Sequence, residues 1–436
     1  MKSNKFIDGL SSFAGKLSSN NYIMAVRDAF AGSIPLTITA AFFLLVNNVL
    51  LAPKTGFLRS MPGHAEIMAI GTQAYNGTLG FLTILITFLI GYRLAKYLKA
   101  DGSIGGMVSV ASYIALVPNQ LTIQGASGKS VPVLGALSQN ETSANAMMMG
   151  IIAGLVGTTI LVKLSKSKRL QIKMPAGVPP AVSKAFSSLF PAFLTITFFA
   201  IIEVLMQTLT GMSPADVIVK VLQAPLVGGF QSLPGILLYV FLATVVFIFG
   251  IHGAFVFGAI SGPILLTSLQ QNIDAIKAGA SAPNIVTQPF LDAYVYMGGG
   301  GTMICLVLAI IIFSRRKDER MIANIGGVAS LFNISEPMMF GVPIVFNPVY
   351  AIPFVLSPLV ATLIAYVSTA AGFVAKTYIL IPWVTPPVIS GYLATGGDWR
   401  ASLMQVITIA ICTLIYAPFV LASNRVFQKQ QAEQQA

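Results

Sequence analysis

Long apolar runs alternate with short polar segments along almost the whole chain. A helix needs ~20 apolar residues to cross the ~30 Å hydrocarbon core of a bilayer, and most of these runs approach that length. The runs lie at 31–51, 79–98, 104–117, 146–162, 189–209, 233–250, 302–314, 348–372 and 403–421, with one further crossing expected inside 254–295. The pattern predicts an all-α polytopic membrane protein with about ten transmembrane helices.

Two segments in the second half of the chain interrupt this pattern with proline, glycine and polar residues. They span about 254–295 and 321–347. Irregular backbone at membrane depth is tolerated only where it is buried in protein or lines a cavity, so we expect two re-entrant hairpins there. The stretch 379–390 contains three prolines and is expected to dip into the membrane without spanning it. The polar segments between the first two spans and at 118–145 are expected to be outer loops.

Composition and charge agree with a membrane protein. The chain of 436 residues is 55% apolar and 9% charged, and its mean hydropathy is +0.81, which excludes a soluble domain of this size. The formal net charge is +12, but 19 of the 26 Lys and Arg fall on one side if the N-terminus is cytoplasmic and the chain crosses ten times. This asymmetry follows the positive-inside rule, so it predicts cytoplasmic termini and gives no indication of nucleic-acid binding.

The same pattern predicts five regions. Residues 1–29 form an amphipathic cytoplasmic or interfacial segment, 30–165 a transmembrane scaffold, 166–186 a basic cytoplasmic linker, 187–423 a substrate-binding region with both hairpins, and 424–436 a short cytoplasmic tail. The spacing of Gly150, Gly154 and Gly157 favours close contact between helices. A scaffold or dimerisation role therefore suits the first half.

The stretch Asn-Ile-Ser-Glu-Pro at 333–337 is the most polar one with apolar flanks. A carboxylate at bilayer depth is unfavourable by roughly 2.5–3.5 kcal/mol, so Glu336 is expected to face protein, water or ligand. Pro337 removes a backbone donor beside it and interrupts the helix. We interpret Glu336 as the leading candidate for a functional residue.

Five further residues are candidate substrate contacts. His252 lies between two glycines, which favours close approach of the backbone to a neighbour, although a buried histidine is often only part of the core. Asn333 and Trp383 lie in the interrupted second half, and Asp292 lies near a chain reversal, where capping a helix is the simpler role. Asn76 precedes a glycine at the start of the second span, where a turn or cap is the simpler role.

An acid, a histidine, amides and an aromatic ring suit a neutral polyhydroxylated ligand, because sugars need paired donors and acceptors and a ring for their apolar face. No Lys or Arg is evident at membrane depth for an anionic substrate. The sequence has no His and Cys cluster with metal spacing and no nucleotide-binding glycine motif, so we expect neither a metal nor another cofactor. Cys305 and Cys412 lie in separate apolar spans and are interpreted as packing residues.

Several short motifs resemble those of the lactose/cellobiose/diacetylchitobiose permeases, the membrane enzyme IIC components of the bacterial phosphotransferase system (PTS). The motifs follow the family's order over essentially the whole chain: Pro35-Leu36-Thr37 with Asn47-Asn48, Tyr75-Asn76-Gly77-Thr78, Gly250-Ile251-His252-Gly253, Gln288-Pro289-Phe290-Leu291-Asp292, Asn333-Ile334-Ser335-Glu336-Pro337 and Asn347-Pro348.

The resemblance implies a homodimer in the bacterial inner membrane, with an N-terminal half that dimerises and a C-terminal half that carries the sugar. The family's site histidine corresponds to His252 and its site glutamate to Glu336. The sugar is expected to be phosphorylated by a phosphocysteine of enzyme IIB, which is served by IIA. Because the chain ends at Ala436, both are expected to be separate polypeptides.

In our working hypothesis, Glu336 accepts a hydrogen bond from the sugar hydroxyl on C6 and acts as general base, while His252 orients it. The motifs leave open whether the sugar is cellobiose, another β-glucoside, diacetylchitobiose or lactose. The same two residues also suit a proton-coupled secondary transporter. A receptor or assembly subunit without transport activity is a further alternative, although interrupted hairpins argue against it.

Overall fold

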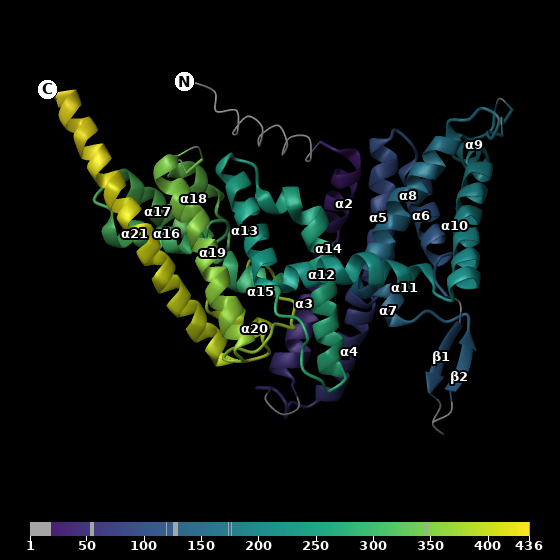
Figure 1. Cartoon of the computed structure of the whole chain (residues 1–436), viewed down its shortest axis with the longest axis horizontal. Coiled ribbons are helices and arrows are strands. Elements are labelled where there is room, and N and C mark those ends of the chain that lie inside the picture. The colour runs from purple at the N-terminus through teal and green to yellow at the C-terminus, as the bar shows by residue number, and fades with distance from the viewer. Residues whose placement is uncertain are drawn as a thin grey trace.

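The computed structural model describes residues 19–52, 56–118, 120–124, 130–172, 174–175, 177–342, 344–345 and 347–435. Most of the predicted amphipathic segment 1–29 lies outside these residues. The chain is mainly helical, as predicted, and its helices form an elongated bundle (Figure 1).

The first half comprises α2 (Asn21–Gly32), α3 (Ile34–Leu45), η1 (Val46–Leu50), α4 (His64–Asn76), η2 (Leu79–Phe81), α5 (Leu82–Tyr97), α6 (Gly102–Ile114), β1 (Gln120–Gln124), β2 (Ser130–Leu134), α7 (Gln139–Thr142), η3 (Ala144–Ala146) and α8 (Met147–Ser165). The linker contains α9 (Pro180–Ser187).

The second half comprises α10 (Leu189–Thr210), α11 (Pro214–Ile218), η4 (Val219–Gln223), α12 (Ala224–Gln231), α13 (Leu233–Ile248), α14 (Gly253–Lys277), α15 (Gln288–Phe290), η5 (Leu291–Val295), α16 (Met303–Phe313), α17 (Lys317–Leu331), α18 (Glu336–Gly341), α19 (Pro348–Ala370), α20 (Ile389–Ala394) and α21 (Trp399–Gln435).

Among the described residues, five helices are long and apolar enough to cross a membrane: His64–Tyr97, Ala144–Ser165, Leu189–Thr210, Val349–Ala370 and Trp399–Arg425. The number rises to seven if each of two bent helix pairs forms one span, with a bend of 41° between α2 and α3 and of 83° between α12 and α13. The shorter apolar helices α6 and α16 coincide with two further predicted spans. The predicted total of ten crossings stays a prediction.

Two expectations for the first half are wrong in detail. The segment before the second span was expected to be a polar outer loop, but residues His64–Asn76 form α4 and continue toward α5. The predicted outer loop at 118–145 contains an antiparallel hairpin in which Gln120 pairs with Leu134 and Gln124 pairs with Ser130. The fold therefore includes a small sheet that the all-α prediction did not contain.

The second half contains breaks where the sequence predicts them. In the segment 254–295, the long helix α14 is followed by an extended stretch and the short turns α15 and η5. In the segment 321–347, α17 ends at Leu331 and α18 begins at Glu336. Residues 371–388 carry no helix, and the dip into the membrane expected for 379–390 stays a prediction.

Basic segments lie along one long side of the molecule. In Figure 1 the start of α2, the linker helix α9 and the C-terminal end of α21 lie along the upper side, and the β-hairpin extends from the lower side. Arg315 and Arg316 lie near the C-terminal end of α21, because Arg315 N–H donates to Asn424 and the Arg316 guanidinium lies 4.4 Å from the centre of the Phe427 ring. This arrangement agrees with the predicted positive side of the membrane.

Candidate functional site

Glu336 lies at the break between α17 and α18. It is the first residue of α18, and its side chain is exposed, whereas Met338 and Met339 of the same short helix are fully buried. The carbonyl of Ser335 accepts hydrogen bonds from both methionine N–H groups, at 3.1 and 2.8 Å. Buried methionines therefore anchor this turn, and the carboxylate remains accessible to a ligand.

Asn333 connects three segments that are distant in sequence. Its backbone is left-handed, with φ of 60°, a conformation that Asn adopts more readily than most residues. Its Oδ1 accepts from the Gly298 N–H at 2.7 Å, and its Nδ2 donates to the carbonyls of Trp383 at 2.6 Å and Thr385 at 3.1 Å. The amide therefore fixes the Glu336 turn against the glycine loop and the 383–385 segment. Its predicted sugar contact stays a prediction.

His252 precedes the first turn of α14. Its ring is tilted against Phe247, with centroids 4.5 Å apart, and is within electrostatic range of Glu336. We expected the flanking glycines to permit close approach of the backbone to a neighbour. At Gly253 that neighbour is α13, because an added Cβ would lie 2.0 Å from the Ala243 carbonyl oxygen.

A cavity of about 330 Å³ lies between the two halves of the chain. Trp383 and Asp292 line it, as do residues from α2, α3, α13 and α14. Its polar side chains are Arg27, Ser33, Thr37, Tyr239, Ser261, Gln288, Asp292 and Tyr296. The combination of hydroxyls, one carboxylate, one guanidinium, one amide and an indole offers both donors and acceptors, which suits a polyhydroxylated ligand.

Asp292 lies inside the π-helical turn η5, not at a helix cap. Its Oδ1 accepts from Gln288 Nε2 at 2.9 Å, and Thr287 caps the preceding turn by accepting from Phe290 N–H at 3.3 Å. The simpler interpretation of Asp292 as a cap is therefore wrong. Asp292 lines the cavity, and its role as a sugar ligand stays a prediction.

The first half contributes a wall of the cavity that sequence reasoning missed. Arg27 Nε lies 2.9 Å from Asp28 Oδ1, and Tyr97 donates to the same carboxylate, so this charged cluster joins α2 to α5. Thr37 lines the cavity and donates to the Ile34 carbonyl. The sequence signal that could have predicted this wall is the pair Arg27-Asp28 directly before an apolar run. We assigned this pair to the interfacial segment.

The cavity does not include all predicted residues. Asn76 is the exposed last residue of α4 and is not among the described residues that line the cavity. Glu336 and His252 also lie outside this lining, but Asn333 links the Glu336 turn to Trp383, which is 45% exposed and lines the cavity. The candidate site therefore comprises this cavity, with Glu336 and His252 outside its lining.

The family model for phosphotransferase system EIIC matches residues 27–358. The chain is 34% identical to the oligo-beta-mannoside-specific EIIC component of Bacillus subtilis, over 97% of this chain and 94% of that protein. It is 32% identical to the cellobiose-specific EIIC component of Geobacillus stearothermophilus, over 97% and 94%. Its structure is similar to the crystal structure of ChbC, the IIC component of the N,N'-diacetylchitobiose-specific phosphotransferase system, with a TM-score of 0.87, 30% identity and 98% of each chain covered.

Proposed function

The chain belongs to the phosphotransferase system EIIC family, and from this premise we propose that it binds a β-linked disaccharide, carries it across the bacterial inner membrane and presents it for phosphorylation. Cellobiose or a related β-glucoside, or diacetylchitobiose, is the proposed substrate. The relatives named for oligo-β-mannosides, cellobiose and diacetylchitobiose support a β-linked sugar.

The cavity of about 330 Å³ is the observation that carries this proposal. An exposed indole ring, that of Trp383, offers a surface for the apolar face of a sugar. Asp292, Gln288 and the hydroxyls of the lining offer donors and acceptors for sugar hydroxyls.

In the proposed reaction, the cysteine of IIB gives its phosphoryl group to the C6 hydroxyl of the sugar. The sulfur–phosphorus bond breaks, the oxygen–phosphorus bond forms, and Glu336 accepts the hydroxyl proton. His252 is proposed to orient Glu336. Phosphoryl transfer depends mainly on positioning and electrostatics. The permease therefore needs only to hold one sugar hydroxyl in line with the incoming phosphoryl group. The exposed position of Glu336 supports access for IIB.

The proposed assembly is a homodimer formed by the first half, with IIB as phosphate donor and IIA behind it. Both termini and the basic linker 166–186 are proposed to face the cytoplasm. The position of α9, Arg315, Arg316 and the end of α21 along the same long side of the molecule supports this orientation.

The test is uptake of radiolabelled cellobiose into vesicles that contain the full-length protein, with and without IIA, IIB and the phosphoenolpyruvate relay. Chromatography then separates free sugar from sugar phosphate. We expect sugar phosphate only with the complete relay. Accumulation of free sugar that follows a proton gradient and needs no relay would contradict the proposal and indicate proton coupling through Glu336 and His252.

A further inference from the structure

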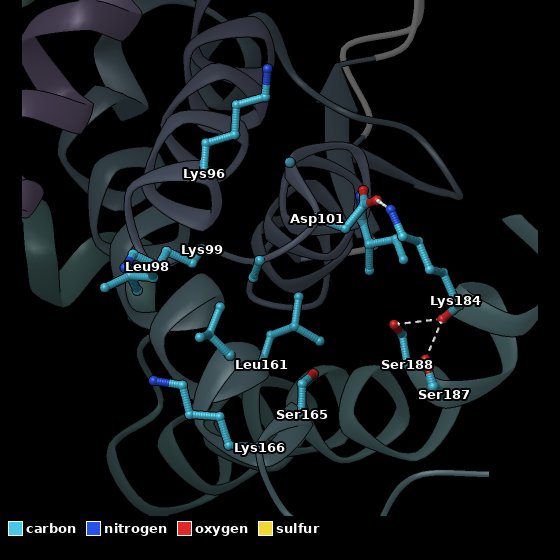
Figure 2. A pocket seen from close by; sticks show the side chains of 14 residues that line it. Lys96, Leu98, Lys99, Asp101, Leu161, Ser165, Lys166, Lys184, Ser187 and Ser188 are labelled. Atoms are coloured by element: carbon cyan, nitrogen blue, oxygen red, sulfur yellow. Dashed lines mark hydrogen bonds and ion pairs between the residues drawn. The ribbon is translucent and has the colours of Figure 1, made fainter. Parts of the chain in front are cut away.

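A second pocket, of about 530 Å³, lies in the first half of the chain, where the end of α5, the start of α6, the end of α8 and the linker helix α9 meet (Figure 2). It shares no lining residue with the sugar cavity. In Figure 1 these helix ends lie on the upper side of the molecule, the side on which α2 begins. Neither the sugar site nor its chemistry accounts for this pocket.

The pocket is strongly basic. Lys96, Lys99, Lys166 and Lys184 line it, and Asp101 is the single acidic residue in the lining. Figure 2 shows Lys99 and Lys166 extending on one side and Lys184 approaching Asp101 on the other, with Lys184 Nζ 3.5 Å from the carboxylate. Among the described residues, no carboxylate forms an ion pair with the other three lysines. One acid thus opposes four lysines, of which Lys96 also lies over the Tyr92 ring, with Nζ 4.4 Å from the ring centre.

Asp101 retains its negative charge at neutral pH. Its Oδ1 accepts from the Ile104 N–H at 3.1 Å and caps α6. This hydrogen bond and the Lys184 ammonium lower the pKa of the carboxyl group. The pocket therefore carries a net charge of three positive units, and an anion is the ligand that would balance it.

Part of the lining of the same pocket is apolar, because it includes Leu98, Ile104, Leu161 and Val162. Beside the pocket, α9 exposes Val182 and Phe186, each 41% accessible, on the short helix that carries Lys184. A helix with exposed apolar and basic residues is typical of the membrane interface.

We infer that this pocket binds the phosphate of an anionic phospholipid, with its acyl chains along the apolar part of the lining. A basic pocket between transmembrane helices on the cytoplasmic side is a known type of lipid headgroup site. A free phosphate ion would use the lysines but not Leu161 and Val162. The lipid would join the ends of α5 and α8 to α9 and so order the linker between the two halves.

The test is native mass spectrometry of the full-length protein, titrated with phosphatidylglycerol or phosphatidylcholine, and in a separate arm with inorganic phosphate. The variant Lys99→Gln/Lys166→Gln removes two pocket charges. The matched control Lys163→Gln/Lys168→Gln removes two charges that lie close in sequence but outside the pocket lining. Because each lysine near an anionic surface contributes about a fivefold gain in affinity, we expect phosphatidylglycerol to bind about 30-fold more weakly to the pocket variant and almost normally to the control.

A second variant is expected to increase the affinity for phosphatidylglycerol. Asp101→Asn keeps an oxygen for the α6 cap but removes the negative charge and releases Lys184, so phosphatidylglycerol is expected to bind severalfold more tightly. Lys99→Arg/Lys166→Arg keeps the charge and is expected to restore binding.

Three results would overturn the inference. The first is equal loss of phosphatidylglycerol in the pocket variant and its control. The second is binding of inorganic phosphate with no preference for the anionic lipid. The third is normal lipid binding in the pocket variant together with lost phosphorylation by phospho-IIB, which would assign the lysines to protein docking. Because lipid binding is measured without sugar or relay, failure of this inference is distinguishable from failure of the proposed function.

Discussion

The two halves of the membrane region achieve their structure by different means. In the first half, α5, α6 and α8 pack through small residues, and an added Cβ at Gly91 would lie 2.2 Å from Ser109 Oγ and 2.6 Å from the Gly105 carbonyl oxygen. In the second half, left-handed backbone at Asn333 and long-range hydrogen bonds hold broken helices together. Close packing suits a rigid scaffold, whereas broken helices leave polar groups available for a ligand.

A buried polar network around Glu319 supports the second half near Arg315 and Arg316. Glu319 is 3% exposed and accepts hydrogen bonds from Ser314 at 2.8 Å, Tyr350 at 3.0 Å and Ser423 at 2.8 Å. Arg316 Nη1 lies 3.1 Å from the same carboxylate. This network joins α17, which leads to Glu336, to α19 and α21. The broken region is thus held by directed polar contacts in addition to apolar packing.

The largest expected effect is a loss of phosphorylation rate in the second half without a loss of folding. Glu336→Gln keeps the size of the side chain but removes the proposed base, so we expect the rate of sugar phosphorylation to fall about 10²–10⁴-fold. Single-turnover transfer from phospho-IIB measures this rate, and gel filtration checks that the protein is folded. Glu66→Gln, an exposed position on α4, is the control. A normal rate in Glu336→Gln would refute the role as base.

The next effect tests the close packing of the first half. Gly91→Ala places a methyl group against Ser109 and the backbone of Gly105, so we expect the free energy of unfolding to fall by about 1–3 kcal/mol. The thermal unfolding midpoint in detergent reports the loss. Gly228→Ala in α12 is the matched control, because no heavy atom lies within 4 Å of an added Cβ there. Equal midpoints for both variants would argue against a tightly packed scaffold.

A smaller effect is expected where Asn333 joins the segments of the site. Asn333→Ala removes three hydrogen bonds, and Asn333→Gly removes the same bonds but accepts the left-handed backbone. At about 1 kcal/mol for each bond, and with partial relaxation, we expect both variants to bind cellobiose about tenfold more weakly. Isothermal titration calorimetry measures the affinity. If the glycine variant bound normally, backbone conformation and not the amide would be the important feature.

The smallest expected effect tests whether the first half only borders the cavity or also contributes to sugar affinity. Thr37→Val removes one hydroxyl from the lining, and we expect cellobiose affinity to fall about threefold, since a single neutral hydrogen bond contributes about 0.5–1.5 kcal/mol. Thr39→Val on the same helix lies outside the lining and serves as control. A loss as large as that of Asn333→Ala would extend the binding site proper into the first half.

Apolar runs predicted individual helices well. The expected spans 189–209, 146–162 and 302–314 correspond to Leu189–Thr210, Met147–Ser165 and Met303–Phe313. The break before Glu336 was also predicted, because proline and polar residues interrupt a helix locally. The strands at 120–134 were missed although Gln120–Gln124 alternates polar and apolar residues, because the polar composition of the segment was interpreted as that of a loop.

The sequence by itself therefore determined the membrane class, most helices, the two interruptions and the leading candidates Glu336 and His252, because hydropathy, charge and helix breaking act within a few turns of the chain. Only the tertiary structure decided that Arg27 and Thr37 share a cavity with Asp292 and Trp383, and that Asn333 fixes two other segments. These relations join residues far apart in sequence, and their positions depend on how helices pack against one another. No local pattern contains that information.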